Sequence, residues 1–228
     1  MRIYAITLIS ILGLYSCSTV HNSSITPPKN FNNGNQISTS GSLGSSGYNL
    51  SLAYSPIKGV FVHGLLNNTI DFDWGYHNSY TYGLGGYINI ENITIEAEIG
   101  TGNGKFEWYS FPGSGSYYSL EHARGFYNKK YLNVSLIFNQ NFGLTLDLGK
   151  LHTRYTYIEN PFERFYDFNS NYPNKYIGGS MFFKFKLASK LKLHLIGGIR
   201  VHQDMLPYPS LIQAGIGLNY RFNLPKIN

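Results

Sequence analysis

The chain of 228 residues contains one cysteine, Cys17, which excludes a disulfide-stapled fold and a cysteine-based zinc site. Charged residues make up only 13% of the sequence, against about 25% in average soluble domains. The 18 basic residues form no cluster along the chain and the net charge of +6 is mild, so the footprint of a nucleic-acid-binding protein is missing. The 7 histidines are dispersed, and the sequence predicts no metal site and no cofactor.

The sequence also lacks an apolar run of the ~20 residues that a membrane-spanning helix needs. Its apolar stretch 3–14 is shorter, follows a basic start and ends in small residues, which is typical of a secretory signal. Leu14-Tyr15-Ser16-Cys17 resembles a bacterial lipobox, so we expect a signal peptide over 1–16 and an acylated Cys17 delivered by the lipoprotein-sorting machinery. The alternative is an ordinary signal with a cysteine at this position by chance. The polar, proline-containing segment that follows predicts a lipidated tether over 17–35.

The sequence is rich in aromatic residues, at 16%, and most of them are tyrosine and phenylalanine, which favour β-strands. No helical periodicity appears after residue 35, whereas apolar and polar residues alternate repeatedly with a period of two. In 191–202, for example, one face is aliphatic and the other carries Lys192, His194 and Arg200. We expect ten strands, over 36–44, 47–55, 60–72, 80–90, 93–105, 124–138, 142–157, 176–188, 191–203 and 210–223.

These segments favour a transmembrane barrel over a soluble sandwich. Many run to about 10 residues or more, against the usual ~5–6, and their polar faces are rich in glycine and serine, as a narrow lumen requires. Short links alternate with long ones, which is typical of outer-membrane barrels. The sequence therefore predicts an all-β fold, an antiparallel up-and-down transmembrane β-barrel over 36–223 with both termini in the periplasm and a short tail over 224–228. Because the first strand is weakly apolar, eight strands are the alternative count, and a soluble lipocalin-like barrel with an apolar interior is the alternative fold.

Five stretches carry a family resemblance to small lipobox-bearing outer-membrane β-barrel proteins of Bacteroidetes-type bacteria. They are Pro28…Phe31…Gly34, Gln36-Ile37-Ser38-Thr39-Ser40, the segment 47–56, His77…Gly83-Leu84-Gly85-Gly86-Tyr87 and the segment 96–104. The likeness covers residues 14–105 and the closing Tyr220-Arg221-Phe222. It implies a fold and an outer-membrane location, with no settled activity. Such a barrel needs the barrel-assembly machinery for insertion, and its surroundings are outer-membrane lipid and lipopolysaccharide.

Charged residues on the polar faces of the strands form a candidate site in the lumen. Because an unpaired charge in a low-dielectric interior is costly, we expect acidic and basic side chains to pair across the narrow lumen and to plug it. The rival interpretation is a narrow pore that favours anions, although open channels usually have about 16 strands. The residues of this predicted network are Glu96, Glu98, Asp147, Lys184, Lys186, Lys192, Arg200 and Arg221.

A second constellation suggests an enzyme as the alternative. Asp71 and Asp73 end the third predicted strand, and His202 and Asp204 end the ninth. By parity all four face inward, and they would meet across the outer mouth of a ten-strand ring. The arrangement resembles that of omptin proteases, in which an Asp-Asp pair faces an Asp-His pair and the histidine acts as general base on water. An omptin-like endopeptidase is therefore the alternative to a non-enzymatic protein.

The long links predict contacts outside the membrane. The links 106–123 and 158–175 are rich in aromatic residues, which favours binding to the surface layer or to a partner protein. The alternative is a lid in which these aromatic residues pack on one another. His152 and Arg154 lie near an outer strand end, at an interface position or against a lipopolysaccharide phosphate. His77-Asn78-Ser79 is expected in a loop. The leading prediction is a small, non-enzymatic outer-membrane lipoprotein barrel with a plugged lumen.

Overall fold

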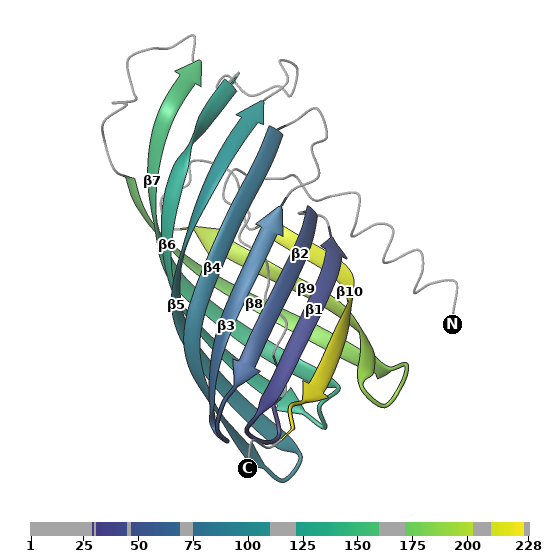
Figure 1. The fold of residues 1–228 in the computed structure, drawn as a ribbon. Coiled ribbons are helices and arrows are strands. Elements are labelled where there is room, and N and C mark those ends of the chain that lie inside the picture. The colour runs from purple at the N-terminus through teal and green to yellow at the C-terminus, as the bar shows by residue number, and fades with distance from the viewer. Residues whose placement is uncertain are drawn as a thin grey trace.

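A computed structural model describes residues 29, 31–44, 47–68, 75–109, 122–159, 172–202 and 211–225. No helix in these residues is long and apolar enough to cross a membrane. Their regular structure consists of ten strands (Figure 1). The strands are β1 (Gln36–Gly44), β2 (Gly47–Ser55), β3 (Val60–Asn68), β4 (Gly75–Ile90), β5 (Ile93–Tyr109), β6 (His122–Phe138), β7 (Phe142–Glu159), β8 (Tyr172–Lys186), β9 (Leu191–His202) and β10 (Leu211–Asn223).

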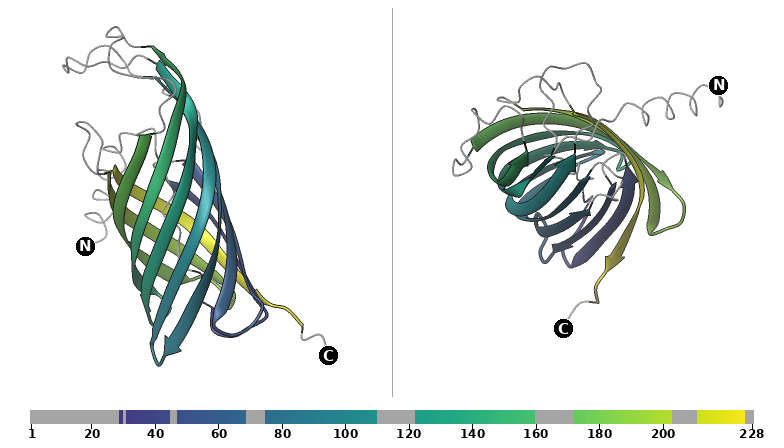
Figure 2. Two further views of the ribbon diagram at one scale, coloured as in Figure 1. Left: turned by 90° about the vertical axis from the view of Figure 1, so that its left-hand side faces the viewer. Right: turned by 90° about the horizontal axis from the view of Figure 1, so that it is seen from above.

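The strands form one closed barrel in which each pairs antiparallel with its neighbours in the chain (Figure 2). The barrel is closed by β1 and β10, whose register runs from Gln36 opposite Asn223 to Gly44 opposite Gly215. Closure leaves the sheet without an edge strand, which is the condition for β-structure in a bilayer. The prediction of an antiparallel barrel with ten strands is confirmed, and the alternative of eight is excluded.

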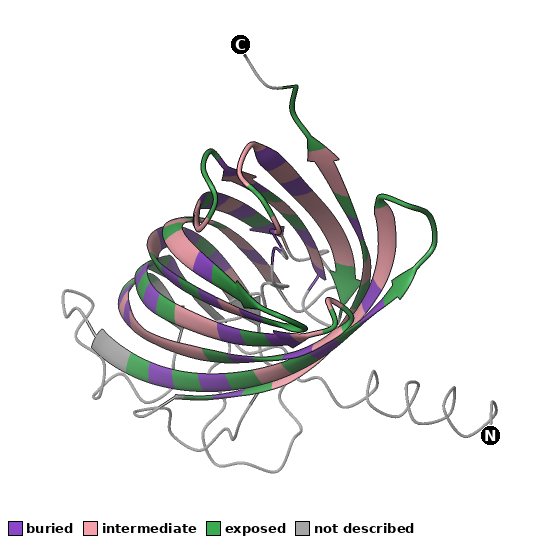
Figure 3. Ribbon diagram, turned by 90° about the horizontal axis from the view of Figure 1, so that it is seen from below, coloured by how far each residue is buried: buried purple, intermediate pink, exposed green. Residues whose placement is uncertain are grey.

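The polarity of the barrel is the reverse of that of a soluble protein. Along most strands, inward residues are more buried than the outward residues that alternate with them, which Figure 3 shows as purple bands between green or pink ones. The exposed set is aliphatic and aromatic, as at Leu84, Ile99 and Phe183, whereas the buried set includes Glu98, Lys184 and Arg200. An apolar exterior around a polar interior is the pattern of a barrel that lies in lipid. The lipocalin-like alternative, with its apolar face inside, is therefore wrong.

The barrel is much taller on one side than on the other. The strands β1, β2 and β3 have 9 residues each, whereas β4, β5, β6 and β7 have 16 to 18 and rise above them (Figure 1). Extension of the tall strands corrects two sequence-based assignments. The expected loop at His77-Asn78-Ser79 belongs to β4, and Phe106, expected in a long link, belongs to β5. Both His77 and Phe106 are buried because their parity in the extended strands turns them inward.

Inward-facing glycines allow aromatic rings to lie flat inside the wall. A Cβ atom at Gly104 would lie 2.3 Å from the ring of Tyr127, which is its direct partner on the neighbouring strand. The same arrangement of a glycine opposite an aromatic residue occurs on several strand pairs, which explains why the polar faces are rich in glycine. The pairs are Gly85 with Phe61, Gly100 with Tyr131, Gly104 with Tyr127, Gly143 with Phe182, and Gly149 with Tyr176.

Candidate functional site

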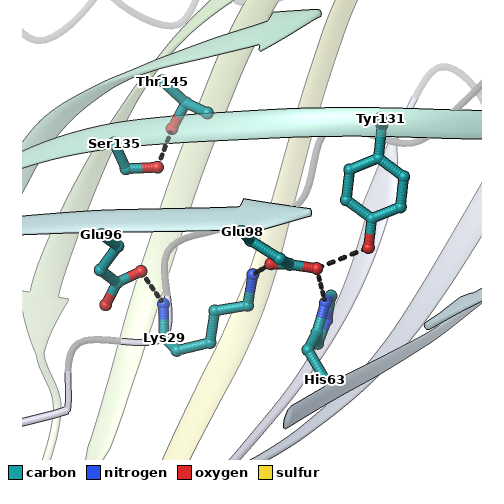
Figure 4. A network of polar contacts seen from close by, with 7 residues as sticks. All are labelled: Lys29, His63, Glu96, Glu98, Tyr131, Ser135 and Thr145. Atoms are coloured by element: carbon teal, nitrogen blue, oxygen red, sulfur yellow. Dashed lines mark hydrogen bonds and ion pairs between the residues drawn. The ribbon is translucent and has the colours of Figure 1, made fainter. Parts of the chain in front are cut away.

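The site lies in the barrel interior and begins at Glu98 on β5. Glu98 is only 3% exposed, and its carboxylate is contacted from three directions (Figure 4). One oxygen accepts a hydrogen bond from the hydroxyl of Tyr131 on β6 at 2.5 Å and lies 2.9 Å from Nδ1 of His63 on β3. The other oxygen forms an ion pair with Nζ of Lys29. A buried carboxylate needs such partners, because an isolated charge in a protein interior is expensive.

Lys29 comes from the segment that precedes the first strand. Its side chain forms the ion pair with Glu98, and its backbone N–H donates to Oε2 of Glu96 at 3.0 Å (Figure 4). Lys29 is therefore held by the two inward-facing acidic residues of β5 and is itself only 6% exposed. The sequence assigns this residue to a lipidated tether, yet the structure places it inside the barrel.

Phe31 fixes the same segment by apolar contact. Its ring is completely buried, and its centroid lies 5.8 Å from those of Phe61 on β3 and Tyr87 on β4. The Nζ atom of Lys29 also lies 5.2 Å from the centroid of Phe61. Burial of an aromatic side chain contributes about 1.5–3 kcal/mol, which adds to the polar contacts that hold this segment.

Hydrogen bonds tie residues 31–35 to the end of the barrel that carries the turns 56–59, 91–92 and 139–141, called here the short-turn end. The Tyr87 hydroxyl donates to the carbonyl of Asn33 at 2.9 Å, and Gln140 of the β6–β7 turn donates to the side chain of Asn32 at 3.0 Å. The Asn89 side chain donates to the carbonyl of Phe31 at 3.2 Å. Residues 31–35 thus cross this end of the barrel between the β6–β7 turn and β1, and Lys29, which precedes them, lies in the lumen. We call residues 29 and 31–35 the inner segment.

A second buried centre surrounds Asp147 on β7. Its carboxylate forms an ion pair with the guanidinium of Arg200 on β9 and accepts a hydrogen bond from the Tyr176 hydroxyl at 3.2 Å. The Arg200 guanidinium also lies over the Tyr176 ring, 4.7 Å from its centroid. The sequence predicts a pairing of Asp147 with the basic strands, and the structure brings it together with Arg200.

Lys129 on β6 connects the two centres. Its ammonium lies 4.8 Å from the ring centroid of Tyr131, which contacts Glu98, and 5.3 Å from that of Tyr176, which contacts Asp147. Lys129 is not among the residues of the charge network predicted from the sequence, although its alternation with Tyr127 and Tyr131 indicates an inward side chain. The interactions run without a break from His63 on β3 to Arg200 on β9, across the interior.

The other residues of the predicted charge network lie closer to the short-turn end. Lys184 is buried, with its ammonium 5.3 Å from the centroid of Phe182. The Lys192 ammonium donates to the carbonyl of Gln140 at 3.0 Å and so contacts the same turn as the inner segment. Arg221 on β10 is partly buried, and Lys186 is exposed at the end of β8.

The residues of the omptin-like alternative are not brought together in the part of the chain that the structure describes. Asp71, Asp73 and Asp204 lie outside the described residues, as does Cys17. His202 is the last residue of β9 and pairs with Tyr176 on β8. Among the described residues, no group of three or more acidic, histidine or cysteine side chains could hold a metal ion.

Most of the aromatic residues expected in the external links also lie outside the described ranges, at 110–121 and 160–171. The described Phe106 packs inside the barrel with Tyr127, Leu151 and Tyr176, and its ring meets that of Tyr155 edge-on at 5.7 Å. This residue therefore belongs to the wall of the tall strands and takes no part in an external loop.

Comparisons with known proteins show a likeness of fold. No protein-family model matches the chain, and no curated protein matches it. Among solved structures, the translocator domain of the autotransporter NalP from Neisseria meningitidis shares 12% identity over 82% of this chain and 86% of that one, with a TM-score of 0.39. The N-terminal β-barrel domain of Pseudomonas aeruginosa OprF shares 10% over 84% and 100%, with a TM-score of 0.32. The attachment invasion locus protein Ail of Yersinia pestis shares 15% over 82% and 95%, with a TM-score of 0.30.

Proposed function

We propose that this chain is a non-enzymatic integral barrel of the outer membrane whose lumen is closed from within. The observation that carries the proposal is the position of Lys29, held between Glu96 and Glu98 by the inner segment. The short-turn end would face the periplasm, and the long links would face outward and contact the surface layer or a partner. The proposal includes an acylated Cys17 that adds a second anchor on the periplasmic side.

Two features support a lumen that is closed to ions, namely its small width and the pairing of its charged side chains. A barrel of about ten strands is narrow, and wide aqueous channels are found at about 16 strands. In this interior the rings of Tyr131 and Tyr176 cover glycines of the wall. The ion pair of Glu98 holds Lys29 of the inner segment in the lumen, and the ion pair of Asp147 links β7 to β9. The same contacts favour a structural role over a catalytic one, because both carboxylates are already bound by cations and hydroxyl groups.

Planar-bilayer recording tests the closed lumen. We expect no stable conductance steps from the unmutated protein, and we expect steps from the variant Lys29→Ala with Phe31→Ala, because these side chains anchor the inner segment. The matched control is Ile57→Ala with Lys58→Ala, two exposed positions in the β2–β3 turn at the same end, which should stay silent. Large, stable, anion-selective steps from the unmutated protein would overturn the closed lumen in favour of a basic pore.

Membrane attachment by the barrel itself gives a further expected outcome. The variant Cys17→Ala should remain in the membrane pellet after extraction with sodium carbonate, because a closed barrel with an apolar exterior holds itself in lipid. Labelling with a radioactive fatty acid should mark the unmutated chain and not the variant. Release of the variant into the soluble fraction would show that the lipid is the main anchor and that the barrel does not span the bilayer.

A further inference from the structure

The outward face of the neighbouring strands β6, β7 and β8 carries a row of lysines that lie far apart in the sequence. Lys130 on β6 lies directly opposite Lys150 on β7, and Lys150 lies directly opposite Lys175 on β8. Each precedes a buried residue of its strand, respectively Tyr131, Leu151 and Tyr176, so the lysines point away from the lumen. Lys130 and Lys175 are exposed, and Lys150 is partly exposed. We call these three residues the lysine row.

The lysine row lies just beyond the apolar surface, on the side of the long links. One pleat nearer the short-turn end, the corresponding positions are Leu132, Leu148 and Ile177, which also pair directly with one another. Further towards the long links the outward positions of β5 and β7 add Lys105, His152 and Arg154. Glu107 is an acidic residue on this part of the face, and it is the register partner of Arg124 on β6. The patch is therefore strongly cationic.

The other six strands show that this patch is not a general feature of the barrel. The described outward positions of β1, β2, β3, β4, β9 and β10 carry no charged side chain. Charge on the outward face of the barrel is thus concentrated on β5, β6, β7 and β8, and the first three of these belong to the taller side in Figure 2. Like charges directly opposite each other destabilise a sheet, so three adjacent lysines favour the binding of an anionic group.

The position of the lysine row indicates which kind of anionic group it binds. Lysine stems can lie along an apolar surface while the ammonium groups reach the level of the lipid headgroups. With neighbouring strands ~4.8 Å apart, the three lysines span about 10 Å, which suits a headgroup with more than one phosphate. Basic residues next to a membrane surface attract anionic headgroups. We propose that the lysine row, extended by Arg154, binds the phosphorylated sugar headgroup of an outer-leaflet glycolipid.

This inference rests on the proposed orientation, in which the long links face outward. Binding is measured on the full chain, folded in a neutral detergent, by native mass spectrometry with bis-phosphorylated lipid A as the probe. We expect the triple variant Lys130→Gln, Lys150→Gln, Lys175→Gln to bind at least tenfold more weakly than the parent. The matched control is Lys58→Gln, Lys186→Gln, Lys190→Gln, three exposed lysines at the short-turn end with the same change of charge, which should bind like the parent.

Two further measurements make the result decisive. Dephosphorylated lipid A should bind the parent and the triple variant equally weakly, and the triple variant should unfold at a higher urea concentration than the parent when no lipid is present, because the repulsion is removed. Equal loss of binding in both triple variants, or equally tight binding of phosphatidylglycerol and lipid A by the parent, would overturn the proposal. Binding in detergent depends on neither lumen closure nor orientation, so this test and the conductance test fail independently.

Discussion

The variant Glu98→Gln is expected to have a free energy of unfolding about 3–5 kcal/mol below that of the parent chain, which is the usual cost of removing one partner from a buried ion pair. The amide keeps the shape of the carboxylate but loses its charge, so the Lys29 ammonium remains buried with its counter-charge gone. Urea titration of the barrel folded in lipid vesicles measures the difference. The control Glu91→Gln removes an exposed carboxylate from the β4–β5 turn and should cost about 0–1 kcal/mol.

A double-mutant cycle separates this pair from the rest of the network. Lys29→Met combined with Glu98→Gln should cost clearly less than the sum of the two single variants, because groups in contact are coupled. Additive costs would mean that Lys29 and Glu98 do not interact, and the inner segment would then lose its main anchor. A cost for Glu98→Gln no greater than that for Glu91→Gln would contradict a buried network altogether.

The barrel could be predicted from the sequence because lipid and lumen demand opposite polarity on alternate residues. Where that demand is continuous, as in 47–55, the predicted bounds coincide with those of β2. It fails at the tops of the tall strands, where β4 begins at Gly75 and not at residue 80. There the outward residues include Tyr76 and Asn78, which occur at the membrane–water interface as well as in loops. The difference in polarity between alternate residues is therefore small.

The interior site could be predicted only in part. Parity identified Glu96, Glu98, Asp147, Lys184 and Arg200 as inward, and all are at least partly buried. Parity does not show which side chains meet across a lumen. That depends on the length of each side chain, on its height along the barrel axis and on the aromatic rings between the two. Lys29 was missed because the polar segment around it looks like a tether. One signal was available, namely that Lys29 and Phe31 are the sole lysine and the sole aromatic residue in 18–35.

The abundance of inward glycine was predicted as a consequence of a narrow lumen, and its structural cause is more specific. Each of several glycines lies beneath the aromatic ring of its direct cross-strand partner, so the wall gains a ring that lies flat and fills space. Interiors are close-packed, and additional atoms force side chains out of their preferred rotamers. The glycines of the interior should therefore differ sharply from those of the exterior in their tolerance of a methyl group.

Gly104→Ala tests this difference. Its Cβ would lie 2.3 Å from the ring of Tyr127, whose hydroxyl is 2.6 Å from Nε2 of His77 and whose ring stacks on that of His77 at 5.5 Å. The ring cannot move without disturbing these contacts, so we expect a loss of about 1–3 kcal/mol in the free energy of unfolding, the usual cost of overpacking. Gly179→Ala is the control, because a Cβ at that exposed position on β8 meets nothing within 4 Å.

The control variant should change stability by less than about 0.5 kcal/mol, as surface substitutions usually do. Urea titration in lipid vesicles measures both variants, and the chemical shift of the His77 ring protons reports whether the Tyr127 ring has moved. An unchanged midpoint for Gly104→Ala, with an unchanged His77 signal, would show that the space beneath the ring is larger than the structure gives. An equal loss of stability in both variants would instead assign the effect to the strand backbone, since of these two glycines only Gly104 lies under a ring.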